Sequence, residues 1–256
     1  SSRTPCTFEA PRVMKGMRYA LGATVFALLL WQGIVWITGV PPFILPSPLR
    51  VAQAAFSNRV LIAENALVTA TEVIFGLIIG TFLGAATAVQ LANSARLHRL
   101  VMPVLIFTQT VPVFALAPIL TLWFGYGIAS KVVMAVLIIY FPVTSAFYDG
   151  LTRVPADILD MAKTMGGTKR EIMRRIKIPH ALPSLGTGLK LAAVYAPIGA
   201  VIGEWVGASK GLGYLMLLAN GRAKTDLMFA SLFALAIMTL LLHFAVSKSS
   251  GRLVQR

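Results

Sequence analysis

Residues 153–184 read RVPADILDMAKTMGGTKREIMRRIKIPHALPS, a stretch in which a Gly-Gly pair separates two segments that each favour a helix. Pro155 suits the first turn of the first helix, because a helix start does not need that residue's N–H. Gly166 and Gly167 can end this helix, since glycine adopts a positive φ without a steric penalty. The first half of the stretch is therefore expected to be a short helix that ends at a glycine elbow.

The second half of the stretch begins with the pattern of a helical N-terminus. Thr168 is followed three residues later by Glu171, and these two residue types at this spacing form a capping box. Pro179 disfavours helical backbone in the residue before it, so this second short helix is expected to stop before Pro179.

The stretch is both basic and amphipathic. Seven of its residues are Lys or Arg, which places it outside the hydrocarbon core of a membrane. Its first helix also carries an apolar stripe, which would suit either a lipid interface or a groove on a partner protein. The stripe residues are Ile158, Met161, Ala162 and Met165.

The rest of the chain is far more apolar than a soluble domain. Of its 256 residues, 57% are hydrophobic and 12% are charged, against roughly 25% charged residues in soluble proteins. This composition excludes an ordinary cytosolic enzyme, whose surface needs more polar groups, and the high hydrophobicity excludes a disordered chain. The single cysteine, Cys6, excludes a disulfide scaffold within the chain.

Long uncharged runs predict an all-α integral membrane protein with six transmembrane helices, because about 20 apolar residues cross the bilayer. The third run is long enough for one span plus a re-entrant or unwound stretch, since three prolines interrupt it: Pro103, Pro112 and Pro118. The first run could instead belong to a signal peptide, but it is longer than such an apolar region. The predicted spans are Tyr19–Thr38, Val73–Ala92, Leu100–Ser130, Val132–Tyr148, Thr187–Val206 and Leu227–Ser247.

Basic residues predict the orientation of these spans. Sixteen of the 23 Lys and Arg residues fall in the two tails, the loop after the second span and the stretch 153–184, whereas six fall in the other loops. Cytoplasmic loops retain Lys and Arg, so both termini are expected in the cytoplasm. The net charge of +14 is then a topology signal, and no nucleic-acid partner is expected. The domains are a tail (1–18), a transmembrane domain (19–247) containing the loop 153–183, and a second tail (248–256).

Two of the spans carry glycines at four-residue spacing, which places each triplet on one face of its helix. Small residues let helices approach closely in lipid, where burial of apolar surface gives no reward. The second and fifth spans are therefore expected inside the helix bundle. The triplets are Gly76, Gly80 and Gly84, and Gly199, Gly203 and Gly207.

Polar groups at membrane depth are candidates for a translocation path. Glu72 and Glu204 are ionisable groups near the ends of their spans, where they face either a path or solvent at the interface. Gln109 and Thr110 lie in the proline-broken third span, and Tyr140 lies in the fourth. Unwound backbone near these residues would be tolerated only where protein buries it or where it lines a cavity.

The stretch 153–184 resembles the cytoplasmic loop signature of binding-protein-dependent ABC importer permeases: Glu-Ala-Ala, three residues, Gly, nine residues, Ile-x-Leu-Pro. Gly166 and Pro179 keep the signature's spacing, whereas Asp160 stands for Glu, Met161 for Ala and Ile178 for Leu.

A second segment, GEWVGASKGLGYLM at residues 203–216, resembles the one that follows the fifth helix in the nitrate, sulfonate and taurine branch of these permeases. That branch includes permeases for thiamine-precursor pyrimidines. With the six-helix plan, the resemblance extends over nearly the whole chain.

The resemblance implies a type I importer permease of the bacterial inner membrane. Two copies would form the path as a homodimer within the lipid bilayer, two cytoplasmic ATPase subunits would bind the loops, and an extracytoplasmic binding protein would deliver substrate. The sequence has no G-x-x-x-x-G-K-[ST] phosphate loop, so no cofactor is expected in this chain, and ATP would bind the partner subunits. The implied coupling residues are Asp160, Met161, Ala162, Met165, Gly166, Ile176, Ile178 and Pro179.

Two other classes of function remain open at this point. An enzyme within the membrane would need a catalytic motif, but His98, His180 and His243 are scattered and no H-E-x-x-H or G-x-S-x-G pattern occurs. A proton- or sodium-coupled carrier would use Glu72 and Glu204 as coupling groups.

The deep polar groups of the predicted spans are neutral or acidic, which favours a neutral or cationic heterocycle over an anion. Among the substrates that the resemblance implies, this favours a thiamine-precursor pyrimidine, with sulfonate, taurine or nitrate as the alternatives.

Overall fold

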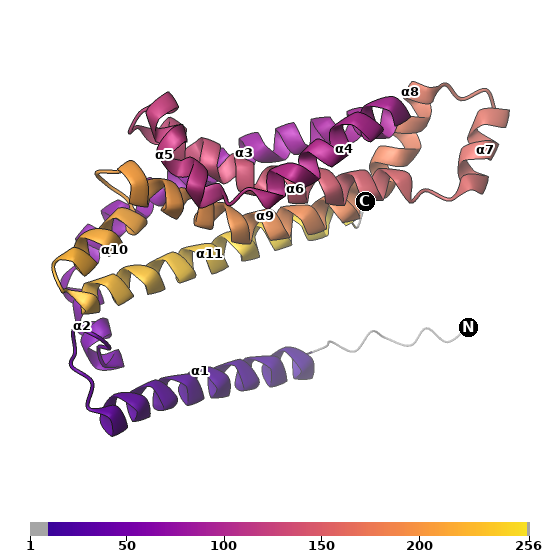
Figure 1. Ribbon diagram of the computed structural model, residues 1–256. Coiled ribbons are helices and arrows are strands. Elements are labelled where there is room, and N and C mark those ends of the chain that lie inside the picture. The colour runs from indigo at the N-terminus through magenta and orange to yellow at the C-terminus, as the bar shows by residue number, and fades with distance from the viewer. Residues whose placement is uncertain (1–9, 255–256) are drawn as a thin grey trace.

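The computed structural model describes residues 10–254, and in this range it contains helices and no strands (Figure 1). The predicted all-α membrane fold is confirmed. The helices are α1 (Ala10–Thr38), α2 (Pro48–Ser57), α3 (Arg59–Asn93), α4 (Ala95–Thr110), α5 (Val113–Phe124), α6 (Ile128–Thr152), α7 (Ala156–Thr164), α8 (Lys169–Ile172), a π-helical turn (Met173–Lys177), α9 (Ile178–Gly207), α10 (Leu212–Gly221) and α11 (Thr225–Val254).

Four helices in the described part are long and apolar enough to cross a membrane by themselves: α3, α6, the continuous helix that ends with α9, and α11. A fifth candidate is the pair α4 and α5, which passes only if its two members count as one broken span. The predicted first span lies in α1, whose described apolar part, Gly22–Thr38, is shorter than the others.

The proline-broken third span is a pair of helices bent by 98°. Pro103 and Pro118 lie inside α4 and α5 without ending them, whereas Pro112 stands before the first residue of α5. Val111, just before that proline, is extended with φ −80° and ψ 121°, as expected for the residue before a proline. Of the three prolines, Pro112 is therefore the one that breaks the span.

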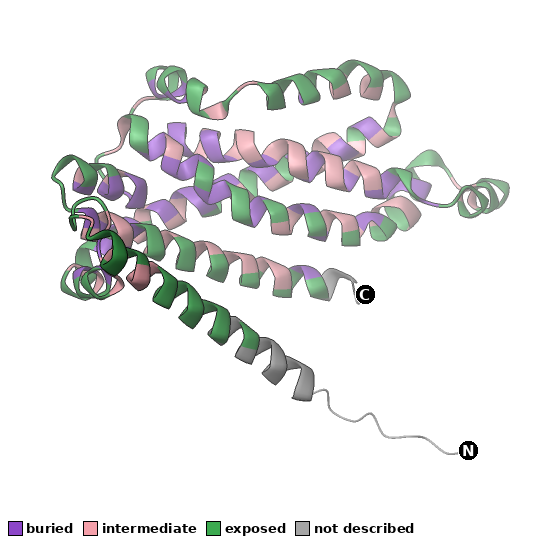
Figure 2. Cartoon of the chain, turned by 60° about the horizontal axis from the view of Figure 1, so that its bottom comes forward, coloured by how far each residue is buried: buried purple, intermediate pink, exposed green. Residues whose placement is uncertain are grey.

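The glycine triplets bring α3 and α9 against α6. A Cβ added at Gly76 would lie 2.5 Å from the Cβ of Ala135, and one added at Gly199 would lie 2.6 Å from the Cα of Ala135. Ala135 is fully buried between these two glycines. The expected packing of both triplets inside the bundle is confirmed, and Figure 2 shows the buried residues gathered on the central helices, whereas the described part of α1 is mostly exposed.

Candidate functional site

The first candidate site is the pair of short helices α7 and α8, which projects from one end of the bundle, opposite α10 (Figure 1). None of the α7 residues is buried. The apolar side chains on α7 and at the elbow are open to the surroundings, with Met161 61% and Met165 80% exposed. A short helix with so much exposed apolar surface has the character of a docking element.

The elbow after α7 depends on both glycines, for two different reasons. Gly166 has a φ of +82°, and its N–H donates to the carbonyl of Lys163 at 2.9 Å. Gly167 has no positive φ, but a Cβ there would lie 2.7 Å from the carbonyl oxygen of Ala162. The prediction of a positive φ is thus confirmed for Gly166, whereas Gly167 is required by close backbone approach.

The capping box at the start of α8 is confirmed. The backbone N–H of Thr168 donates to Glu171 Oε2 at 3.0 Å, and the N–H of Glu171 donates to Thr168 Oγ1 at 3.3 Å. Hydrogen bonds from the Thr168 backbone and hydroxyl hold the pKa of the exposed Glu171 carboxyl below its usual value, with a smaller effect from Arg175. These bonds fix the direction in which the chain leaves the elbow.

Thr168→Ala is expected to loosen the first turn of α8. The N–H of Glu171 loses its acceptor, and its hydrogen exchange should become about fivefold faster at neutral pH. Thr168→Ser keeps the hydroxyl and should match the unmodified protein. Because the pKa of Glu171 is lowered in the folded state, the carboxylate's contribution is present at neutral pH and is lost as pH falls through that pKa. Equal exchange rates in both variants at neutral pH would contradict this assignment.

The prediction that the second helix stops before Pro179 is wrong. The helix runs without interruption from Lys169 to Gly207, through a π-helical turn in which the N–H of Ile178 donates to the carbonyl of Met173, five residues back. Pro179 then occupies the first turn after this register change. Because the regular hydrogen-bond pattern is already interrupted there, the N–H that proline lacks does not end the helix. The loop helix and the fifth span are one continuous rod.

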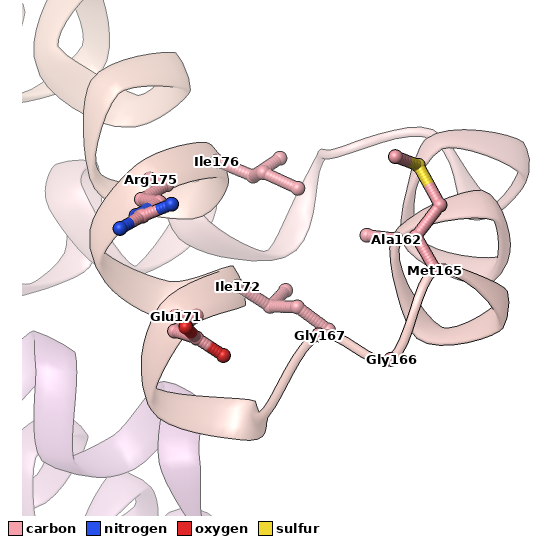
Figure 3. A pocket seen from close by; sticks show the side chains of 8 residues that line it. All are labelled: Ala162, Met165, Gly166, Gly167, Glu171, Ile172, Arg175 and Ile176. Carbon is pink, nitrogen blue, oxygen red and sulfur yellow. The ribbon is translucent and has the colours of Figure 1, made fainter.

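A pocket of about 290 Å³ lies between α7 and the start of this rod. Figure 3 shows Ala162 and Met165 on one wall and Ile172 and Ile176 on the other, with Glu171 and Arg175 also lining the pocket. The pocket is therefore an apolar cleft with one acidic and one basic side chain.

The structure brings some of the sequence-predicted coupling residues together and leaves others apart. Ala162, Met165, Gly166 and Ile176 all line the pocket. Asp160 faces solvent and pairs with Lys163 at 2.8 Å. The other predicted residues lie away from this pocket: Met161 is exposed on α7, and Ile178 and Pro179 belong to α9.

The predicted path residues do not form one site in this chain. Glu72 and Glu204 are both buried inside the bundle, each at most 3% exposed, and Thr69, one turn before Glu72 on α3, donates to Glu204 at 2.6 Å. Tyr140 is half-buried, and its hydroxyl lies 2.8 Å from Thr87 Oγ1, between α6 and α3. Gln109 and Thr110 are exposed at the end of α4.

The burial of Lys131 is not evident from the sequence, where this residue lies between the third and fourth predicted spans. Its side chain is 1% exposed, and its ammonium group donates to the carbonyls of Tyr126, Gly127 and Gly207. The available signal was a single Lys that starts an otherwise uncharged run and has acidic residues on other spans as possible partners.

Residues 76–256 match the model of a protein family described as binding-protein-dependent transport system inner membrane component. The chain belongs to this family. It is therefore the permease subunit of an ABC importer and a membrane component of that system. The predicted resemblance is confirmed, including its branch, because the relatives include permeases named for formylaminopyrimidine, aliphatic sulfonates and taurine.

Two relatives are similar to this permease over most of its length. A protein of Haemophilus influenzae, described as a probable ABC transporter permease, is 46% identical over 86% of this chain and 89% of its own. The formylaminopyrimidine transport permease protein ThiX of Halalkalibacterium halodurans is 37% identical over 92% of this chain and 95% of its own.

The permease also has the fold of a solved importer. An inward-facing structure of the MetNI methionine ABC transporter matches it with a TM-score of 0.68 and 20% identity, over 77% of this permease and 98% of that chain. This match confirms the predicted type I importer permease fold.

Proposed function

We propose that this permease moves a small heterocycle inward, and that α7 and α8 receive the force from a separate ATPase. The observation that carries this proposal is the continuous helix Lys169–Gly207. Because no flexible joint lies between the loop helix and the fifth span, a displacement of the loop is transmitted to α9 as a rigid-body movement.

The exposed face of α7 is the proposed contact with the ATPase. Met161 and Met165 supply apolar area, and methionine side chains adapt well to a partner groove. Gly166 sets the angle between α7 and the rod, and Ile176 continues the apolar wall of the pocket. Two permease copies, two ATPase subunits and an extracytoplasmic binding protein complete the proposed assembly.

The proposed orientation places α7 and both termini in the cytoplasm of a bacterial inner membrane. The start of α1 and the end of α11 both point toward the α7 end of the molecule in Figure 1, and most Lys and Arg residues fall on that side. The α10 end is then the outer end, where a binding protein would deliver substrate.

The proposed substrate class is a neutral or cationic heterocycle such as a formylaminopyrimidine. This proposal agrees with the 37% identity to ThiX and with the buried polar groups, which apart from Lys131 are neutral or acidic. An anionic substrate would be better served by an unpaired Lys or Arg along the path, whereas the ammonium of Lys131 is already taken by three carbonyls.

Uptake into vesicles that contain the permease, its ATPase and its binding protein tests this function. We expect uptake of labelled formylaminopyrimidine that requires ATP, with most of the signal removed by a tenfold excess of unlabelled compound and little by the same excess of taurine, as for a single saturable site. Uptake on an ion gradient without ATP would contradict the importer mechanism and favour a carrier. Competition by taurine alone would contradict the substrate class.

A further inference from the structure

Three ionisable groups meet at the α10 end of the bundle, away from the loop helices. Glu72 comes from α3, Lys131 from α6 and Glu204 from α9, and each is at most 3% exposed. Among the described residues, α10 adds backbone N–H groups to this cluster and no charged side chain. Buried charges are costly unless they are paired and hydrogen bonded, so the protonation of this cluster can be worked out from its donors and acceptors.

Glu204 is the acceptor of the cluster. Its Oε1 accepts from the hydroxyl of Thr69 at 2.6 Å, and its Oε2 accepts from the N–H of Gly213. The hydroxyl of Thr69 in turn accepts from the N–H of Leu212 at 2.8 Å. Because both carboxyl oxygens receive protein donors, Glu204 is held in its ionised form, as an acceptor at the N-terminus of α10.

Two glycines allow α10 to approach this carboxylate. Gly211 has a φ of +122°, and a Cβ there would overlap the carboxyl group of Glu204. A Cβ at Gly213 would lie 2.8 Å from Glu204 Oε2. The Gly-Leu-Gly sequence at 211–213 is therefore the backbone counterpart of Glu204.

Lys131 is the cation of the cluster. An ammonium group has three N–H donors, and three carbonyl oxygens surround this one, including that of Gly207 at 2.9 Å. A neutral amine could supply only two of these hydrogen bonds. The geometry therefore fixes one positive charge on Lys131.

Glu72 is left as the proton carrier. Its carboxyl group is buried one helical turn after Thr69, which donates to Glu204, so an ionised Glu72 would bring a second buried negative charge close to the first. Glu204 already accepts on both oxygens, whereas Oε2 of Glu72 has no hydrogen-bond partner among the described residues. With the proton on Glu72, the cluster carries one negative and one positive charge, and without it the interior would hold an uncompensated negative charge.

We propose that Glu204 and Lys131, with a proton held on Glu72, form a charge-neutral latch that positions α10 at the outer mouth of the permease. Lys131, near the start of α6, donates to the carbonyl of Gly207 at the end of α9. Glu204 of α9 accepts from the N–H of Gly213 in α10. The role at the outer mouth rests on the orientation given under the proposed function. The latch itself depends only on contacts within this chain.

Two variants with the same Glu-to-Gln change test the latch, because only one of them is expected to release α10. Glu72→Gln supplies an N–H in place of the carried proton and should leave α10 in place. Glu204→Gln replaces one acceptor oxygen with an NH₂ group, so either Thr69 or Gly213 loses its acceptor and α10 should be released more often. The probe is a maleimide reacting with Ala219→Cys, a buried α10 position, in a Cys6→Ser background.

We expect labelling of the Glu72→Gln protein within about twofold of the parent. Labelling of the Glu204→Gln protein should be roughly tenfold to a hundredfold faster, as for loss of a hydrogen bond to a charged group. Equal labelling rates in the two variants would overturn the latch.

The proton itself has an infrared signature, which a purely structural role for Glu72 would not produce. A protonated carboxyl group on Glu72 should give a carbonyl band at neutral pH that disappears in Glu72→Gln. A band that persists in this variant would overturn the assignment of the proton. Labelling and infrared measurements need neither ATPase nor binding protein, so their outcome is separate from any failure of ATP-dependent uptake.

Discussion

Gly166→Pro is expected to abolish co-purification of this permease with its ATPase while the chain still inserts into the membrane. Proline fixes φ near −65°, whereas Gly166 has a φ of +82°. The substitution also removes the N–H that donates to the carbonyl of Lys163. The elbow therefore cannot keep its geometry, and α7 should leave the position from which it presents Met161 and Met165.

The measurement is the amount of ATPase retained on a tagged permease after detergent extraction. Retention by Gly166→Pro should fall below about a tenth of that of the unmodified permease, which corresponds to a loss of at least about 1.4 kcal/mol in binding.

Gly166→Asn is the matched control for this experiment. Asparagine tolerates the left-handed region better than most residues, and a Cβ at Gly166 meets nothing within 4 Å. This variant should retain more than about half of the ATPase, since the cost of asparagine at such a position is small. Normal retention and uptake by Gly166→Pro would contradict the coupling role of the elbow, and an equal loss in both variants would show that the backbone angle is not the cause.

The features that sequence alone predicted correctly are local ones. Thr168 and Glu171 are three residues apart, and their capping box needs no other part of the chain. The positive φ of Gly166 follows in the same way from the end of a short helix. The long apolar spans are also local, because bilayer thickness sets their length.

The features that sequence could not predict depend on the neighbours of a residue in space. Pro179 resembles a helix stop in the sequence. The π-helical turn before it has already changed the hydrogen-bond register, so the helix continues although Pro179 has no N–H to donate. Pro103, Pro112 and Pro118 look equivalent in sequence, and only Pro112 ends a helix. In each case the hydrogen bonds of the surrounding helix decide whether the proline breaks it.

The buried cluster shows the same limit more strongly. The side-chain oxygen of Asn65 accepts from the N–H of Gly211, 146 residues away along the chain. Lys131 lies between two predicted spans in the sequence, and its hydrogen bond to the carbonyl of Gly207 requires the start of α6 to lie beside the end of α9. Two acidic residues near span ends indicate a path or an interface. Both are buried inside the bundle, and Glu204 accepts hydrogen bonds from Thr69 and Gly213 of other helices.

Gly199→Ala is expected to destabilise the helix bundle although alanine favours a helix by up to about 1 kcal/mol over glycine. The new methyl group would lie 2.6 Å from the Cα and 2.8 Å from the backbone nitrogen of Ala135. Backbone atoms cannot move aside as the end of a flexible side chain can, so α6 and α9 must separate. The cost of such overpacking is about 1–3 kcal/mol, which should lower the midpoint of thermal unfolding in detergent by several degrees.

Gly22→Ala provides the control, because a Cβ at this α1 position meets nothing within 4 Å. The same substitution there should leave the midpoint unchanged or raise it, since only helix propensity is altered. Ala135 is also the residue that Gly76 of α3 approaches, so a shift of α6 away from Gly199 pushes it toward α3. Gly76→Ala should therefore give a loss of similar sign, and the double variant should lose more than either single variant. A Gly199→Ala protein as stable as the parent would contradict the close crossing of α6 and α9, on which transmission of movement from the loop to the rest of the bundle depends.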